Sequence, residues 1–516
     1  MKKAAIGLFC LFFWLFACSA DHPHDRRVLR YGLPQAPVSL DPAVATDLSY
    51  SQIVFNIYET LVRFDWDSGQ FVPVLAASWE QEQEGLCWKF SLRPNIIFHD
   101  GTPFTAEAVK ISFERQFDSD CRYFRAGKTD THGAVFRDVI EEIRIIDDFT
   151  IAFILRHPHA AFLDYLASPI MATIVSPSAL AKLGEAIGEH PVGTGPFEFV
   201  QSDVQEISLR RFERYWGKLP DLQEVNYKIV PVLTRRVEQL ERGALNVITG
   251  LSPVTANRLY HSPEIEVLPE KLLATTFLGF HCQKPPFTEV SMRKAVAASL
   301  NVPELIAFAS QGFATPAQNP LPATAFGHFA SLVQTAYDSS SHFPIAGNDH
   351  HKALFDTLYL HYFVETDSLR DHPLAQALKT ALRKAGLQLE LVRHQDWEAY
   401  SQQVLRSDLG HLFWEGWTGY HRHADGFLYP LFHSRSQHNY FQYQNPQVDE
   451  LLELARHTLP ATEQEEIYRQ VQEIILAEVP AVFLSHPQAV YALRRNVAGF
   501  KVDPLAIPWL HEVTLK

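Results

Sequence analysis

Segments typical of β-strands alternate with segments typical of amphipathic α-helices along most of this chain. Residues 28–34 and 87–94 have strand-like patterns, whereas residues 372–386 place leucines at helical spacing. A similar apolar stripe predicts a helix over residues 50–64. This alternation favours an α/β fold. A chain of 516 residues exceeds what one hydrophobic core serves, so we expect two or three domains.

The N-terminus has the pattern of a secretory signal. Lys2 and Lys3 precede a nearly uncharged apolar run, residues 4–17, which is too short to span a bilayer comfortably. The run ends in "LFAC", which resembles the bacterial lipobox, in which the cysteine is diacylated and becomes the new N-terminus. We therefore predict a signal peptide over 1–17 and lipidation of Cys18, with cleavage without lipid as the alternative. Acyl chains would hold the protein on a membrane surface.

Charge and cysteine content exclude several classes of protein. The formal net charge is −14 and no segment concentrates basic residues, which argues against nucleic-acid binding. Beyond Cys10 and Cys18 the chain has three cysteines without CxxC spacing, which rules out a disulfide framework or a zinc ribbon. One bridge, between Cys87 and Cys121, is allowed in an oxidising compartment.

The common catalytic and cofactor motifs are missing. The sequence contains no G-x-S-x-G, G-x-x-x-x-G-K-[ST], H-E-x-x-H or G-x-G-x-x-G pattern. The adjacent His99 and Asp100 precede Gly101, and Asp-Gly after an apolar run is a strong turn signal. Thr105 is placed to cap a following helix. We interpret this pair as a turn and not as a catalytic dyad, and we expect no enzyme activity, catalytic residue or cofactor.

The same stretch belongs to a longer pattern. Residues 72–115, with "LAASW", "WKFSLR" and "FHDGTPFTAEAV", resemble the signature of the family 5 solute-binding proteins of bacterial ABC importers. Further matches are "HPVGTGPFEFV" (190–200), "FTEVSMRKAVAASLN" (287–301) and the region 478–500. The resemblance extends over almost the whole mature chain. That family includes the oligopeptide, dipeptide and nickel binders.

The resemblance implies an α/β fold of the two-lobed periplasmic-binding-protein type II, with an extra subdomain inserted in the N-terminal lobe. We assign 18–27 to a lipidated tether, 53–189 to the inserted subdomain and 273–487 to lobe II. Lobe I comprises 28–52, 190–272 and 488–516.

The implied function is that of a monomeric receptor. It would capture a peptide-like or other small solute between two closing lobes and deliver it to ABC permease and ATPase subunits. It would lie in the periplasm or at the cell surface, anchored by lipid. Ser19 after the cysteine favours the outer membrane in a cell with two membranes.

The segment 413–432, "FWEGWTGYHRHADGFLYPLF", resembles the family's "GW-D-PDPDNFL" segment. In dipeptide-binding members, an aspartate four residues after the glycine holds the ligand's ammonium group. The position counted from Gly416 is Tyr420 here. A phenol cannot supply the counter-charge that a buried ammonium requires. Asp425 matches the second aspartate of the family pattern, and its role is interpreted as mainly structural.

Several side chains are candidates for the solute site. Arg422 suits bidentate pairing with a ligand carboxylate. For the aromatic candidates, core packing remains the alternative. The complete set of predicted ligand-binding residues is Tyr58, Phe280, Trp414, Gly416, Trp417, Tyr420, Arg422 and Asp425.

Histidines crowd the same segment. His421 and His423 lie two residues apart, and His433 and His438 follow. Because nickel-binding relatives use histidine near their solute, His421 and His423 are candidate metal ligands, although His-x-His alone is a weak signal. A nickel-chelate or haem receptor of the same fold is therefore the first alternative. A lipid-anchored scaffold or chaperone without a transported ligand is the second.

Overall fold

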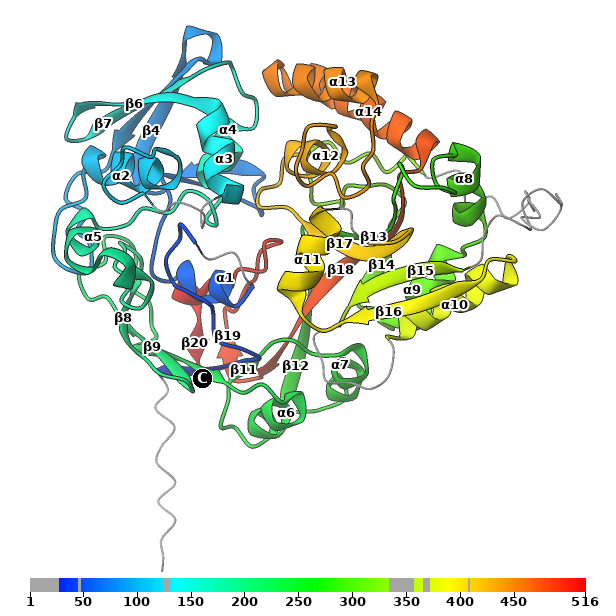
Figure 1. The fold of residues 1–516 in the computed structure, drawn as a ribbon. Coiled ribbons are helices and arrows are strands. Elements are labelled where there is room, and N and C mark those ends of the chain that lie inside the picture. The colour runs from blue at the N-terminus through cyan, green and yellow to red at the C-terminus, as the bar shows by residue number, and fades with distance from the viewer. Residues whose placement is uncertain (1–26, 45–47, 125–129, 334–356, 365–371, 407–408) are drawn as a thin grey trace, which may run out of the picture.

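The computed structural model describes residues 27–44, 48–124, 130–333, 357–364, 372–406 and 409–516. The signal sequence, Cys18 and the region 334–351 lie outside these described residues. Figure 1 shows two halves joined near the bottom of the view, with a smaller helix-and-sheet unit at the upper left. Among the described residues, no helix combines the length and apolar character needed to cross a membrane.

Lobe I is built on one end of a 12-stranded mixed sheet, in the order β11-β1-β10-β9-β8. β1 pairs in parallel with both β10 and β11, while β8, β9 and β10 form an antiparallel run. Its strands are β1 (Val28–Leu33), β8 (Phe197–Ser202), β9 (Glu206–Arg211), β10 (Glu224–Ile229), β11 (Val247–Ile248) and β12 (Ile265–Lys271). Its helices are α1 (Leu48–Val54), α5 (Pro177–Leu183), α6 (Leu233–Glu241) and α7 (Pro253–Leu259). A short C-terminal pair, β19 (Val497–Ala498) and β20 (Thr514–Leu515), completes it.

Lobe II occupies the other end of this sheet, in the order β16-β15-β17-β13-β18. Its strands are β13 (Ala274–Phe280), β14 (Ala314–Pro316), β15 (Leu358–Phe363), β16 (Leu389–His394), β17 (Leu412–Thr418) and β18 (Ala481–Arg494). Its helices are α8 (Val290–Ala298), α9 (Val302–Ser310), α10 (Pro373–Lys384), α11 (Trp397–Leu405), α12 (Asp425–Phe432), α13 (Pro446–His457) and α14 (Ala461–Glu478).

The long strand β18 connects the two lobes. Its first half pairs with β13 and β14, and Ala314 lies opposite Pro487. Its second half pairs with β12, beginning at Lys271 opposite Gln488. One continuous strand therefore serves both lobes, and its partner changes between residues 487 and 488.

The smaller unit contains an antiparallel sheet in the order β4-β5-β7-β6 and a separate two-stranded sheet, β2-β3, and it has its own hydrophobic core. Its strands are β2 (Val62–Asp65), β3 (Gln70–Pro73), β4 (Ala76–Glu82), β5 (Cys87–Leu92), β6 (Ile140–Asp147) and β7 (Thr150–Leu155), and its helices are α2 (Ala106–Phe117), α3 (Asp130–Val139) and α4 (Phe162–Ala167). The buried residues of this core run from Leu61 to Ile174. They occupy a narrower range than the predicted insertion, 53–189, and the domain boundaries themselves stay a prediction.

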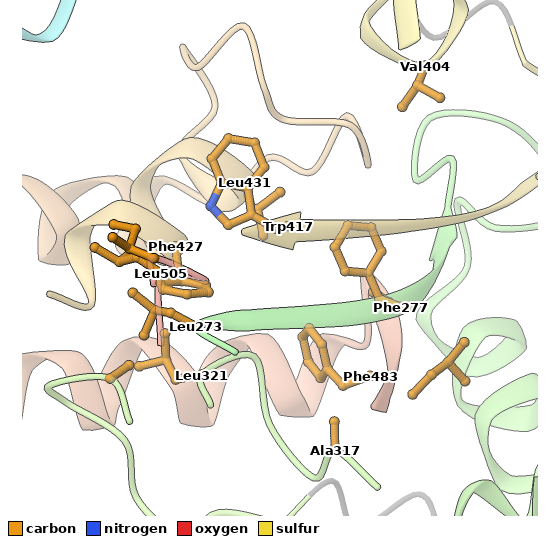
Figure 2. Close-up of a cluster of buried hydrophobic side chains, with 14 of the residues drawn as sticks. Leu273, Phe277, Ala317, Leu321, Val404, Trp417, Phe427, Leu431, Phe483 and Leu505 are labelled. Carbon is orange, nitrogen blue, oxygen red and sulfur yellow. The ribbon is translucent and has the colours of Figure 1, made fainter. Parts of the chain in front are cut away.

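The largest core cluster crosses from lobe I into lobe II. Figure 2 shows part of it, where Phe427 of α12 and Leu273 lie near Leu505 of the C-terminal segment, and Phe277 of β13 lies across from Phe483 of β18. Fully burying a side chain of this kind contributes about 1.5–3 kcal/mol relative to leaving it exposed. The connection between the lobes is therefore a packed core.

The helix predicted over 50–64 is wrong beyond Val54, where α1 ends. The carbonyl groups that would continue the helix have other partners: Asn56 accepts from the Phe197 amide and Ile57 from the Gly195 amide, both at 2.9 Å. A Cβ atom at Gly193 would lie 2.1 Å from the Ile57 oxygen. The "GTGPF" glycines are thus needed for close backbone approach.

The interpretation of the His99–Asp100 pair as a turn is confirmed. Gly101 has a φ of 83°, and the Asp100 carboxylate accepts from the Thr102 amide at 3.0 Å. His99 faces the backbone of the "GTGPF" segment, with Nε2 3.0 Å from the Gly195 oxygen. Burial lowers its pKa to about 4. The histidine is a packing and hydrogen-bonding group.

The three cysteines that the structure describes are unpaired. The thiols of Cys87, Cys121 and Cys282 are all free, so the bridge that we considered between Cys87 and Cys121 is not formed.

Candidate solute-binding site

The predicted segment after β17 meets the inserted subdomain directly. Arg422 Nε lies 3.1 Å from Asp164 Oδ1 of α4, and both side chains are largely buried. The Arg422 guanidinium also lies over aromatic rings, with its carbon 4.2 Å from the centroid of Phe64 and 5.5 Å from that of Phe326. These rings come from β2 and from lobe II. Arg422 therefore bridges the two sides, and its positive charge is held by a carboxylate and by ring faces.

A second charged group lies next to this pair. Tyr165 of α4 donates a hydrogen bond from its hydroxyl to Asp425 Oδ2 at 2.5 Å, and Arg456 Nε lies 2.6 Å from Asp425 Oδ1. Burial alone would raise the pKa of Asp425, but Arg456 and the Tyr165 hydroxyl hold it well below its usual range. Asp425 is thus the charged centre of a contact between α4 and the start of α12, which agrees with its predicted structural role.

Tyr420 completes the contact through its backbone. Its carbonyl oxygen accepts a hydrogen bond from the Ser168 hydroxyl at 2.6 Å. We call the contacts of residues 159–168 with residues 420–425 and Arg456 the seam. A cavity of about 20 Å³ borders the seam, which is the space of roughly one water molecule. This cavity is too small for a solute of peptide size.

Three imidazoles are buried at the seam. His421 packs against the Tyr165 ring at 4.8 Å between centroids, and His159 lies 5.0 Å from the same ring. Burial lowers the pKa of each to about 3. His423 is also buried and its pKa is lowered; its Nδ1 accepts from the Asp425 amide at 3.2 Å, and its Nε2 lies 3.2 Å from Gln464 Oε1. All three rings are therefore neutral parts of the packing.

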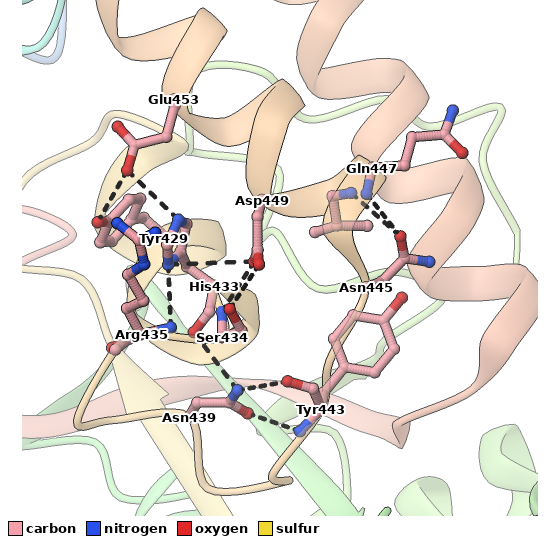
Figure 3. Close-up of polar contacts among 12 residues, drawn as sticks. Tyr429, His433, Ser434, Arg435, Asn439, Tyr443, Asn445, Gln447, Asp449 and Glu453 are labelled. Carbon is pink, nitrogen blue, oxygen red and sulfur yellow. Dashed lines mark hydrogen bonds and ion pairs between the residues drawn. The ribbon is translucent and has the colours of Figure 1, made fainter.

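The start of the seam rests on a polar network between α12 and α13, drawn in Figure 3. Asp449 accepts from the amide of Ser434 at 2.8 Å and from its hydroxyl at 2.5 Å. His433 stacks on Tyr429 at 4.3 Å, and its Nε2 lies 3.3 Å from Glu453 Oε1. His433 thus takes part in a helix-to-helix contact. These bonds fix α12, and with it the position of Asp425.

The predicted residues of β17 lie in two settings. Trp414 is partly open and packs on the His372 ring at 4.7 Å, while Trp417 is buried and donates its indole N–H to the Gly426 oxygen at 2.6 Å. His438 packs on the same indole at 5.4 Å. Gly416 lies opposite Thr276 in the β13–β17 ladder. The strand therefore presents Trp414 and its neighbours near the lobe surface, and Trp417 supports them from behind.

Two predicted residues lie elsewhere. Tyr58 and Phe280 are 1% and 0% exposed and belong to the large hydrophobic core, where Phe280 packs on Phe287 at 4.8 Å between ring centroids. Their placement matches the core-packing alternative. A role for either residue in solute binding stays a prediction.

Sequence reasoning missed the partners on the other side of the seam. Asp164 and Tyr165 lie in a short apolar helix without a motif, and Arg456 lies in an ordinary amphipathic helix. A signal existed only in retrospect: Asp164 is a carboxylate in an otherwise apolar stretch, "AAFLDYLASPIMA". A buried carboxylate requires a partner, and its partner is far away in the sequence.

Comparison with known proteins agrees with the fold. The family model described as "Bacterial extracellular solute-binding proteins, family 5 Middle" matches residues 70–439. The chain belongs to this family. It is 28% identical to the glutathione-binding protein GsiB of Pectobacterium atrosepticum over 90% of each chain. It is 26% identical to the dipeptide-binding protein of Escherichia coli K12 over 100% of this chain and 99% of the relative.

A solved structure of a family relative superposes over nearly the whole chain. The periplasmic binding protein DppA of Helicobacter pylori, in complex with the peptide STSA, has a TM-score of 0.82 and 27% identity, over 95% of this chain and 98% of that one. The predicted two-lobed fold of the periplasmic-binding-protein type II is therefore confirmed. As a family 5 member, the chain is an extracellular solute-binding protein.

Proposed function

We propose that this protein is the receptor of an ABC importer, not an enzyme, and that it captures peptide-like solutes between its two lobes. The observation that carries the proposal is the seam, where α4 of the inserted subdomain meets the segment that follows β17. Its charged contacts, Arg422 with Asp164 and Tyr165 with Asp425, suit a surface that forms and breaks. A solute that bridges both lobes would favour the closed state over the open one.

The relatives support the peptide class. Two of them are a glutathione-binding and a dipeptide-binding protein, and the superposed DppA structure holds a tetrapeptide. Peptides carry an ammonium group, a carboxylate and amide groups. The site residues that we carry forward for such a solute are Trp414, Gly416, Trp417, Tyr420 and Arg422.

A metal ion held by His421 and His423 is less well supported by the geometry. Both ring nitrogens of His423 have hydrogen-bonding partners, and the ring centroids of His421 and His423 are 6.5 Å apart. Among the described residues, no group of three or more histidine, cysteine, aspartate or glutamate side chains is placed to hold a metal ion. Metal binding at His421 and His423 would have to break the packing of the seam.

We further propose that Cys18 carries the lipid anchor and that the mature protein is a monomer that docks on permease and ATPase subunits. Labelling of growing cells with a radioactive fatty acid tests the anchor. The wild type should incorporate label and float with membranes, preferentially the outer one, whereas Cys18→Ala should do neither. Equal labelling of the two proteins would contradict lipidation at this residue.

Thermal unfolding with a panel of solutes tests the function. The mature protein is heated with di- to pentapeptides, glutathione, haem and the nickel–histidine chelate, and its Tm is recorded. A bound solute present at 100 times its Kd should add about 2.7 kcal/mol to the free energy of unfolding. A shift with peptides supports the proposal, a shift with haem or the chelate alone transfers it to the alternative solute, and no shift with any compound favours the scaffold.

A further inference from the structure

A carboxylate without a cation lies on β17, next to the predicted site. Glu415 is paired with Phe277 of β13 across the ladder. Its Oε1 accepts the amide hydrogen of Gly416 at 3.1 Å, and the Tyr400 hydroxyl of α11, which donates to the Trp414 oxygen at 3.0 Å, is near enough to lower the pKa of Glu415. The side chain lies deep in the molecule and still keeps surface open to solvent. Glu415 is therefore deep in the protein but not fully covered.

The electrostatic surroundings of Glu415 contain no positive partner. Burial raises its pKa to about 7, and only the Gly416 amide and the Tyr400 hydroxyl act in the opposite direction. Among the residues that the structure describes, no lysine, arginine or histidine forms an ion pair with it. A buried carboxylate in this state is held half-protonated near neutral pH, and the arrival of a cation would favour its charged form.

The other acids of this region are already satisfied. Asp164 is paired with Arg422 and Asp425 with Arg456. Asp503, which lines the small cavity of the seam, accepts backbone hydrogen bonds from Leu505 at 2.9 Å and Ile507 at 3.1 Å. Glu415 is thus the acid of this group that has neither a cation nor a set of backbone donors.

A group of aromatic rings lies next to this part of β17. Tyr440 lies within electrostatic reach of both Glu415 and Tyr420, since these two groups add to the burial that raises its pKa. Its ring centroid is 6.0 Å from that of Trp417, which in turn lies 6.5 Å from Tyr420. Aromatic faces attract cations, and a carboxylate next to them forms a site for a protonated nitrogen.

We propose that Glu415 is the specificity-determining counter-charge for a protonated amine on the solute. The family resemblance assigns this role to an aspartate at the position of Tyr420. In this chain Glu415 would fill the role, from strand β17 and not from the loop that follows it. The inference rests on the proposed receptor function and narrows it to solutes with a free ammonium group. That group is either the N-terminus of a peptide or the side chain of a lysine-like residue.

Calorimetric titration tests the proposal with three probes: a free peptide, the same peptide N-acetylated, and an N-acetylated peptide that contains lysine. Glu415→Gln keeps the size of the side chain and removes its charge, and Glu390→Gln, in an exposed ion pair on β16, is the matched control. Losing the partner of a buried charge should weaken the binding of an amine probe about 30-fold or more, while the control should bind as the wild type does.

The pattern over the probes decides the outcome. If the wild type prefers the free peptide over its acetylated form and Glu415→Gln loses this preference, the amine that Glu415 binds is the N-terminus. If the acetylated peptide that contains lysine restores binding to the wild type, the amine is that of a side chain. A wild-type affinity for the amine probe that rises with pH through about 7, and is flat in the variant, supports the same conclusion. The proposal would be overturned if Glu415→Gln weakened the binding of the amine probes and of the acetylated probe equally, or weakened neither. Failure of every peptide to bind the wild type would instead contradict the proposed function.

Discussion

The inserted subdomain makes two charged joints, and they differ in how they are built. Toward lobe I, Arg115 of α2 holds Asp41 through two hydrogen bonds of 2.7 and 2.8 Å, and both side chains are nearly inaccessible, at 2% and 0%. Toward lobe II, Arg422 meets Asp164 through one contact of 3.1 Å, and the arginine is 21% exposed. The first joint is a permanent part of the fold, whereas the second is suited to opening.

Removing the arginine of the inner joint should have the largest effect. Arg115→Met leaves the Asp41 carboxylate buried without a cation, which should lower the free energy of unfolding by about 3–5 kcal/mol. Denaturant titration followed by circular dichroism measures this loss. The double variant Arg115→Met with Asp41→Leu should regain part of the stability, because no charge is then left unpaired. A single variant within about 1 kcal/mol of the wild type would contradict the assignment of a structural joint.

Acidification should act on the outer joint and spare the inner one. His159 and His421 have a pKa of about 3 when buried at the seam, and an exposed imidazole titrates near 6.5. Because burial lowers these histidine pKa values, the closed state has its full stability only at a pH above about 6.5. This stability is lost as the pH falls below that value, where an exposed imidazole takes up a proton. Each histidine should then weaken the closed state by about 1.4 kcal/mol per pH unit.

The charged groups that face these two imidazoles leave this sign unchanged. Asp425 raises both pKa values, but burial lowers them by more. Arg456 and His423 also lower the pKa of His159, and Arg422 and His423 also lower that of His421. Small-angle scattering between pH 7 and 5 should therefore show a more open molecule. His421→Gln removes one of the three buried imidazoles of the seam, so it should make the pH dependence of opening less steep. A wild-type profile that does not change with pH would contradict the prediction.

The two joints also show what a sequence can and cannot predict. The family signature in residues 72–115 and the turn at Asp100-Gly101 depend on neighbours in the chain, and both were predicted correctly. The α4 side of the seam was missed, because its pairs join residues 258 to 260 positions apart, from Asp164 to Arg422 and from Tyr165 to Asp425. Only the folded topology brings such residues together.

The end of α1 teaches the same lesson within one lobe. The apolar stripe over 50–64 has helical spacing, but the carbonyl groups after Val54 accept hydrogen bonds from residues 195 and 197. Tertiary partners therefore override the local pattern. Tyr58 shows why aromatic residues were ambiguous: its type suits a core or a solute site equally, and only its burial assigns it to the core.

The smallest effect is expected at the outer joint itself, and it would sharpen the comparison most. Asp164→Asn removes one charge of a partly exposed pair, so the closed state should lose only about 1 kcal/mol, roughly a fivefold shift toward the open form. The free energy of unfolding should change little, in contrast to Arg115→Met, because an open seam returns the Arg422 guanidinium to water.

Single-molecule energy transfer between dyes on α13 and on β6 measures this population directly, with Glu142→Gln, in an exposed ion pair of β6, as the control. Added salt should shift the wild type toward the variant, since an accessible pair is screened. A loss of global stability as large as that of Arg115→Met would mean that both joints are structural, and the outer contact would then have no part in opening.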